Sequence, residues 1–225
     1  RALHSAHDAL LTSPHRLDGL EEARRSPRAP GKPRVAFYWN ASCGGCEEAV
    51  VDLGEGFADL AERVEIVLWP VALDFKRADV EALPDGGIDV AFVNGAVRLS
   101  EQDEWAVLLR RKARTLVAFG ACAHLGGVVG LGNLSEPVEL LETAYRDQPS
   151  VSNPDQHLPG TRVLAAGHEL TLPSLLSRAL PLAEVVPVDY VIPGCPPSPA
   201  VIAAALEPLL TGVGLPPPGA VLAPN

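Results

Sequence analysis

Short apolar runs alternate with amphipathic stretches between residues 34 and 211. Apolar runs bounded by polar or glycine-containing segments are typical of buried strands. They predict strands at Val35–Trp39, Val64–Trp69, Ile88–Val93, Thr115–Gly120 and Tyr190–Ile192. Strands that alternate with helices indicate an α/β fold with a doubly wound, mostly parallel sheet.

The stretches between these strands predict helices at Glu47–Leu60, Ser100–Lys112 and Pro199–Leu210. The helix at Ser100–Lys112 carries acidic residues in its first turn and basic residues in its last, which suits the helix dipole. The helix at Pro199–Leu210 is apolar nearly all round. This pattern predicts that it is buried.

Three segments depart from the alternation of strands and helices. The pattern of residues 149–175 predicts a small hairpin inserted before the last strand. Residues 1–33 are polar and rich in Arg and Pro, and we expect an N-terminal arm that packs on a partner subunit. Residues 212–225 are rich in Gly and Pro, and we expect an extended C-terminal linker. The folded domain is therefore predicted to span residues 34–211.

Composition narrows the classes of function. The chain has 225 residues, 47% of them hydrophobic, and a formal charge of −10. A net acidic chain has no electrostatic footprint for nucleic acid or for an anionic membrane. No apolar run reaches the roughly 18–20 residues that span a bilayer, so we expect no membrane span. We also see no secretory leader, which favours metal ligation over disulfides for the cysteines.

The chain contains four cysteines: Cys43, Cys46, Cys122 and Cys195. Each follows a predicted strand or lies in a Gly- or Pro-rich turn. Because the carboxyl ends of parallel strands share one edge of a sheet, we expect all four thiols on loops at that edge. Four converging thiolates suit an iron–sulfur cubane or a tetrahedral zinc ion.

Two alternatives to the cluster stay open at this point. A structural zinc site usually combines two close Cys-x-x-Cys pairs, and only Cys43 and Cys46 are close in this sequence. A thioredoxin-like dithiol would also place such a pair before a helix. That interpretation leaves Cys122 and Cys195 without a role.

Three motifs together resemble the small subunit of a [NiFe] hydrogenase. The type that the chain most resembles is the cytosolic, F420-non-reducing (methyl-viologen-reducing) small subunit that docks on heterodisulfide reductase. The similarity covers roughly Arg34 to Asn225. The motifs are Tyr38-Trp39-Asn40-Ala41-Ser42-Cys43-Gly44-Gly45-Cys46-Glu47, then Gly120-Ala121-Cys122-Ala123 with Gly126-Gly127, and Asp189-Tyr190-Val191-Ile192-Pro193-Gly194-Cys195-Pro196-Pro197.

This resemblance implies a flavodoxin-like domain whose Cys43, Cys46, Cys122 and Cys195 hold one proximal [4Fe-4S] cluster. It implies a separate large subunit that carries the Ni–Fe centre and splits H₂. The chain would be a cytoplasmic oxidoreductase subunit that is inactive alone. It would pass electrons to a downstream iron–sulfur or flavin subunit, such as a heterodisulfide-reductase-like partner.

Glu47 directly follows a predicted ligand and is a candidate for a proton path, although it also suits the dipole of the helix that it begins. The chain departs from the resemblance at Asn94-Gly95, where hydrogenase small subunits often have Glu-Gly. A second departure is His124, which lies two residues after Cys122. The resemblance also implies a cysteine-rich tail after the proline-rich segment, and the position where it would begin is the end of this sequence, Pro224-Asn225.

Two related assemblies are alternatives. A homologous subunit of the quinone-reducing respiratory complex uses adjacent cysteines, whereas this chain has Cys43-Gly-Gly-Cys46. Energy-converting membrane hydrogenases share the Cys-x-x-Cys spacing.

Overall fold

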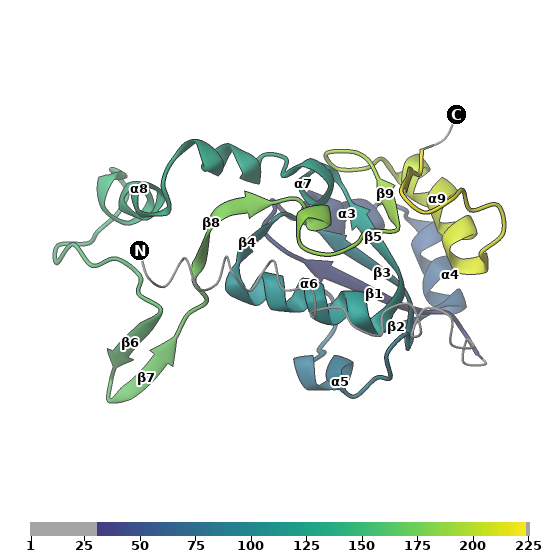
Figure 1. Cartoon of the computed structure of the whole chain (residues 1–225), viewed down its shortest axis with the longest axis horizontal. Coiled ribbons are helices and arrows are strands. Elements are labelled where there is room, and N and C mark those ends of the chain that lie inside the picture. Colours follow the sequence, from purple (N-terminus) through teal and green to yellow (C-terminus); the bar gives the residue numbers. More distant parts are fainter. Residues whose placement is uncertain (1–30, 224–225) are drawn as a thin grey trace.

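A six-stranded sheet runs through the centre of the computed structural model, which describes residues 31–223 (Figure 1). Every neighbouring pair in this sheet is parallel. The α/β prediction is therefore confirmed. The strands are β1 (Arg34–Trp39), β2 (Glu65–Leu68), β3 (Ile88–Asn94), β5 (Ala113–Phe119), β9 (Tyr190–Ile192) and β10 (Ala220–Val221).

The order across the sheet is β10-β9-β5-β3-β1-β2. Counted along the chain, the first five strands follow the order 2-1-3-4-5 of flavodoxin-like folds, and β10 extends the sheet beyond β9. The order reverses between β1 and β3. In such sheets, ligand sites form outside the carboxyl ends of the strands, near this reversal.

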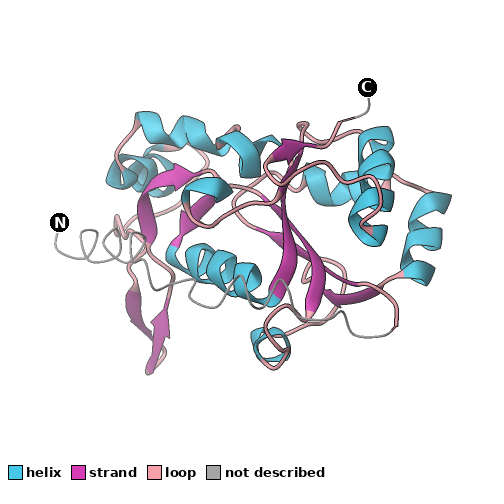
Figure 2. Ribbon diagram, turned by 45° about the vertical axis from the view of Figure 1, so that its right-hand side comes forward, coloured by secondary structure: helices cyan, strands magenta, loops and turns pink. Residues whose placement is uncertain are grey.

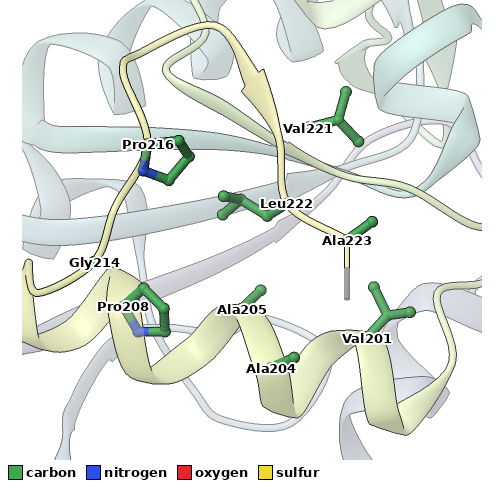
Figure 3. Close-up of a pocket in the computed structure, with 9 residues that line it drawn as sticks. All are labelled: Val201, Ala204, Ala205, Pro208, Gly214, Pro216, Val221, Leu222 and Ala223. Atoms are coloured by element: carbon green, nitrogen blue, oxygen red, sulfur yellow. The ribbon is translucent and has the colours of Figure 1, made fainter. Parts of the chain in front are cut away.

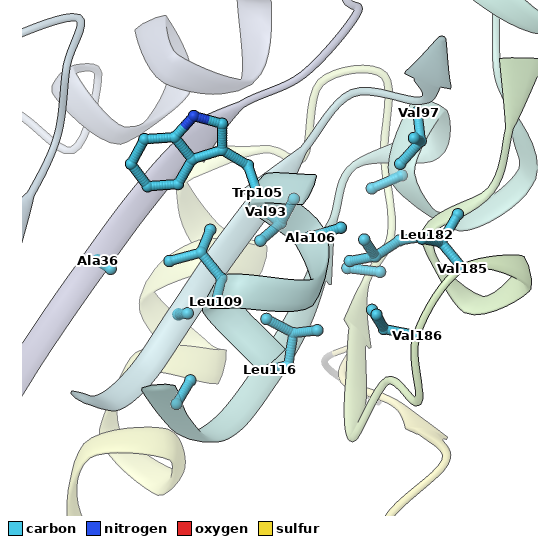
Figure 4. Close-up of a cluster of buried hydrophobic side chains, with 14 of the residues drawn as sticks. Ala36, Val93, Val97, Trp105, Ala106, Leu109, Leu116, Leu182, Val185 and Val186 are labelled. Atoms are coloured by element: carbon cyan, nitrogen blue, oxygen red, sulfur yellow. The ribbon is translucent and has the colours of Figure 1, made fainter. Parts of the chain in front are cut away.

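Helices cover both faces of the sheet (Figure 2). On one face, buried residues such as Leu109 and Leu116 form a core with Trp105 (Figure 4). On the other, Val50, Leu60 and Leu209 pack on the sheet. The first face is covered by α5 (Arg77–Glu81), α6 (Ser100–Lys112) and α7 (Ala121–Leu125), and the second by α3 (Gly45–Val51), α4 (Glu55–Arg63) and α9 (Pro199–Thr211).

Two helix predictions need correction. The helix expected at Glu47–Leu60 is two helices, α3 and α4, separated by a turn. Gly54 ends that turn with φ +60° and ψ −124°, a conformation open mainly to glycine, so the chain changes direction there. The prediction that α9 is buried is also wrong for much of its surface, because Ala200, Ala203 and Ala204 are exposed.

The inserted hairpin is confirmed. Strands β6 (Arg162–Ala165) and β7 (His168–Thr171) pair antiparallel, with Ala165 opposite His168. The sequence did not indicate a second small sheet, in which β4 (Val97–Leu99) pairs antiparallel with β8 (Leu175–Leu180). These pairs extend the molecule away from the central sheet (Figure 1).

The two chain ends bear on the predicted domain limits. The arm expected at 1–33 lies almost entirely outside the described residues. The segment expected as a linker, 212–225, contains β10, which pairs with β9 and is therefore part of the central sheet. Between residues 31 and 223, no helix has both the length and the apolar character needed to span a lipid bilayer.

Candidate metal centre

The four cysteines lie at the carboxyl edge of the sheet. Cys43 is in the loop between β1 and α3, and Cys46 is in the first turn of α3. Cys122 is in α7, directly after β5, and Cys195 is in the loop between β9 and α9. Cys46 and Cys122 are buried, whereas Cys43 and Cys195 are exposed. The predicted placement on one edge is what the structure shows.

Main-chain hydrogen bonds join the loops that carry these residues. The Gly120 N–H donates to the Ile192 carbonyl at 2.8 Å, and the Ala121 N–H donates to the Gly194 carbonyl at 2.7 Å. The segment before Cys122 therefore runs beside the segment before Cys195. The third loop reaches the same place, because a Cβ atom at Gly45 would lie 3.5 Å from Cys43 Sγ and 3.8 Å from Pro196 Cδ.

Two glycines leave room for the thiols. A Cβ atom at Gly120 would overlap Cys46 Sγ, and one at Gly127 would lie 2.6 Å from Cys122 Sγ. Both glycines have positive φ values, +85° and +51°. Glycine is therefore required at these positions both by the backbone conformation and by the neighbouring sulfur.

The electrostatics of Cys46 also indicate that the four thiols are neighbours. Burial, with smaller contributions from the charges of Cys122, Cys43, Cys195 and Glu47 in that order, raises the pKa of Cys46 to about 12. A thiolate at Cys46 would thus be unfavourable without a cation beside it. A positively charged metal group supplies that compensation.

Four cysteines from separate loops could hold either an iron–sulfur cluster or a zinc ion, and these two groups differ in the ligand separations that they need. Within residues 31–223, no three Cys, His, Asp or Glu side chains are close enough together to bind one metal ion in common. A zinc ion needs four ligands within about 2.3 Å of a single point. A cubane binds each thiolate at a different iron atom, so its ligands stand further apart.

Glu47 lies in a chain of hydrogen bonds that we name the Glu47 network, made by Ser42, Glu47, Trp69 and Asn94. The Glu47 carboxylate is buried and accepts from the indole N–H of Trp69 at one oxygen. Its other oxygen accepts from Asn94 Nδ2 at 2.5 Å. Ser42 Oγ donates to Asn94 Oδ1 at 3.0 Å and accepts from the Gly44 N–H at 3.3 Å.

Burial raises the pKa of Glu47, and its hydrogen bonds with Trp69 and Asn94 oppose that rise. Both partners donate to the carboxylate, and the indole N–H has no lone pair with which to accept a proton. These contacts hold Glu47 in one position. The sequence singled out Glu47 and Asn94 separately but gave no signal that Trp69 or Ser42 joins them.

Other residues near the cysteines are placed more simply. The Trp39 ring covers Gly44, where a Cβ atom would lie 3.2 Å from the ring. His124 is half-buried in α7, and its main-chain N–H donates to the Gly120 carbonyl at 3.1 Å.

A pocket of about 320 Å³ lies between α9 and β10 (Figure 3). Its lining residues, such as Val201 and Leu222, are apolar or glycine, so it offers no group for acid–base or metal chemistry.

Known proteins resemble this chain over most of its described length. A profile of the family of the NADH ubiquinone oxidoreductase 20 kDa subunit matches residues 43–209. The iron–sulfur subunit of the F420-non-reducing hydrogenase of Archaeoglobus profundus is 42% identical over 83% of the chain. The chain spans only 58% of that relative's length. The delta subunit of the NAD-reducing hydrogenase HoxS of Cupriavidus necator is 30% identical, with 81% of the chain and 80% of the relative aligned.

A solved structure shares the fold. A chain of an NAD⁺-reducing [NiFe]-hydrogenase in its H₂-reduced state superposes with a TM-score of 0.68 and 34% identity. The match covers 81% of this chain and 93% of that one. The chain therefore belongs to the NADH ubiquinone oxidoreductase 20 kDa subunit family, and hydrogenase iron–sulfur subunits are among its homologues.

Proposed function

We propose that this chain is the electron-transfer small subunit of a [NiFe] hydrogenase complex. The observation that carries the proposal is the meeting of Cys43, Cys46, Cys122 and Cys195 at one sheet edge in a homologue of hydrogenase iron–sulfur subunits. One [4Fe-4S] cluster held by these four cysteines would accept and release single electrons. The chain's own residues bind the cluster, keep water from its buried side and set its environment.

The partner belongs to the same proposal. A large subunit with the Ni–Fe centre would convert H₂ into two protons and two electrons, and the electrons would leave through this chain one at a time. A further iron–sulfur or flavin subunit, or a heterodisulfide-reductase-like protein, would receive them. We place the complex in the cytoplasm because the sequence motifs resemble the cytosolic, F420-non-reducing type of hydrogenase small subunit.

A role for Glu47 as a proton path stays a prediction. Its two oxygens face the Trp69 indole and the Asn94 amide, neither of which is a proton carrier. We therefore favour a positional role for this carboxylate.

A second candidate is an iron–sulfur subunit of a respiratory-complex-like or energy-converting membrane assembly. The family profile favours it, because that family is named for NADH ubiquinone oxidoreductase. The hydrogenase relatives favour the first candidate. A zinc or thioredoxin-like protein has no support from the relatives.

The test is H₂-dependent reduction of a viologen dye by the complex purified without oxygen. We expect activity in the complex, none in this chain alone, and less than about 1% of activity in Cys122→Ser, because electrons must pass through the cluster. A complex that contains clusters but no nickel, and that reduces no dye with H₂, would support the second candidate instead.

A further inference from the structure

The Glu47 network closes around both ends of the Cys43–Cys46 segment. Ser42 directly precedes Cys43, and Glu47 directly follows Cys46. A single side chain bridges these two residues: Asn94 Oδ1 accepts from Ser42 Oγ at 3.0 Å, and Asn94 Nδ2 donates to Glu47 at 2.5 Å. One carboxamide on a neighbouring strand therefore contacts the residues on either side of the cysteine pair.

Asn94 is itself fixed in place. It is 1% exposed at the end of β3, and its main-chain carbonyl accepts from the Asn40 N–H at 2.9 Å. The next residue, Gly95, has φ +84°, and a Cβ atom there would lie 2.6 Å from the carbonyl carbon of Asn40. This close approach leaves the end of β3 no room to shift relative to β1.

The bridge requires a carboxamide. Its Ser42 end needs an acceptor, and its Glu47 end needs a donor. A leucine of similar size provides neither, and it leaves a buried carboxylate oxygen without a partner. The far side of Glu47 is held by Trp69 on the chain segment after β2, so the network ties three neighbouring loops to the cysteine pair.

We propose that Asn94, with Glu47 and Ser42 as its two contacts, is a positioning residue that holds Cys43 and Cys46 at the separation a bound iron–sulfur cluster requires. This inference rests on the proposed function, because it presupposes the cluster. Partners that orient metal ligands in this way typically change metal affinity by about 10–100-fold when they are lost.

The experiment measures how fast iron leaves the purified complex in the presence of a chelator. We expect Asn94→Leu to release iron about 10-fold faster than the wild type. The matched control is Asn133→Leu, because Asn133 also uses both ends of its carboxamide, accepting from the Ala179 N–H at 2.7 Å and donating to the Ala179 carbonyl at 2.9 Å. Both of these bonds go to β8 rather than to a segment that carries a cysteine, and we expect wild-type iron release.

A reciprocal exchange separates positioning from general destabilisation. In the double variant Asn94→Asp with Glu47→Gln, residue 94 accepts at both ends and residue 47 supplies the donor, so the bridge is restored. We expect its iron release and the electron paramagnetic resonance spectrum of its reduced cluster to match the wild type within about twofold in rate. If the double variant behaves like Asn94→Leu, or if Asn94→Leu behaves like Asn133→Leu, the proposal is wrong.

If the Asn94→Leu protein does not accumulate in a folded form, a less disruptive variant can replace it in the test. Ser42→Ala opens only one end of the bridge, and we expect faster iron release than in the wild type; a wild-type rate would contradict the proposal. A wild-type complex without iron and sulfide would overturn the proposed function itself. A wild-type complex that holds a cluster and is unaffected by these variants would overturn only the role of Asn94.

Discussion

Cys46 Sγ touches Gly120 so closely that no side chain fits at residue 120. Gly120 belongs to the loop that carries Cys122, and Cys46 belongs to α3 on another part of the sheet edge. This contact joins two of the predicted ligand loops directly. Cys46 Sγ can occupy its position only because residue 120 is a glycine and has no Cβ atom.

Gly120→Ala tests this contact. The new methyl group would push Cys46 away, and alanine would also be strained at φ +85°, so we expect loss of the cluster iron and about 1–3 kcal/mol of destabilisation. Iron content and thermal unfolding measure the two effects.

Gly167→Ala is the control for backbone strain. Gly167 has φ +81° in the inserted hairpin, with nothing within 4 Å of a Cβ atom. We expect this variant to keep its iron. Equal iron loss in both variants would mean that the contact with Cys46 is not the cause.

Replacement of single cysteines tests the ligand set. We expect Cys122→Ser and Cys195→Ser to lose the intact [4Fe-4S] cluster, because serine is a poor substitute for a thiolate ligand of iron. The spectrum of the dithionite-reduced complex reports this loss. Near-normal spectra and dye reduction in either variant would remove that cysteine from the ligand set.

A buried ion pair stabilises the opposite edge of the sheet. Arg110 Nη1 lies 2.6 Å from Asp189 Oδ2, and their side chains are 0% and 5% exposed. Asp189→Asn leaves the Arg110 charge without its carboxylate, and we expect a cost of about 3–5 kcal/mol in urea unfolding. The spectrum of the cluster should not change, because Asp189 precedes β9 and Cys195 follows it.

The surface pair Arg63–Glu207 provides the comparison. Its side chains are 53% and 60% exposed, so we expect Glu207→Gln to cost no more than about 1 kcal/mol. Similar losses in Asp189→Asn and Glu207→Gln would contradict the importance that we assign to the buried pair.

The phenol of Tyr38 leads to a prediction about how the free energy of unfolding changes at alkaline pH. Burial, with a smaller contribution from the charge of Glu101, raises the pKa of Tyr38 above its usual range, and Arg77 opposes this. The unfolded chain loses the phenol proton near pH 10, before the folded chain does. Ionisation above that pH therefore favours unfolding, and the contribution of Tyr38 is fully present only below it.

We expect Tyr38→Phe to reduce the loss of unfolding free energy between pH 9.5 and about pH 11. Tyr145→Phe is the control, because Tyr145 is 45% exposed. If the two variants depend on pH in the same way, burial of Tyr38 is not responsible for the effect.

The sequence predicted the central fold well because hydrophobic runs and glycine-rich loops report local structure directly. The five expected strands are present, and the cysteines follow their carboxyl ends as predicted. The break between α3 and α4 was missed because Asp52–Gly54 lies inside a stretch that otherwise has helical periodicity. The pairing of β4 with β8 was missed because residues far apart in sequence create it, and no local pattern marks such a pair.

The same limit applies to the site. The four cysteines could be identified because their residue type and their turns are specific. The Glu47 network could not, because Trp69 lies 22 residues and Asn94 47 residues from Glu47 in sequence. Tryptophan and asparagine also have many roles other than bonding a carboxylate. Gly120 and Gly127 belong to a motif that the sequence revealed, but nothing in the sequence indicated that a Cβ atom at either position would meet a sulfur atom.

The most direct test of the central claim is an analysis of iron, acid-labile sulfide and nickel in the complex purified without oxygen, with each metal assigned to its subunit. We expect about four iron and four sulfide per copy of residues 1–225, lost together in Cys122→Ser, and nickel only in a co-purified large subunit. Zinc without sulfide at this chain would contradict both the cluster and the electron-transfer function that we propose for it.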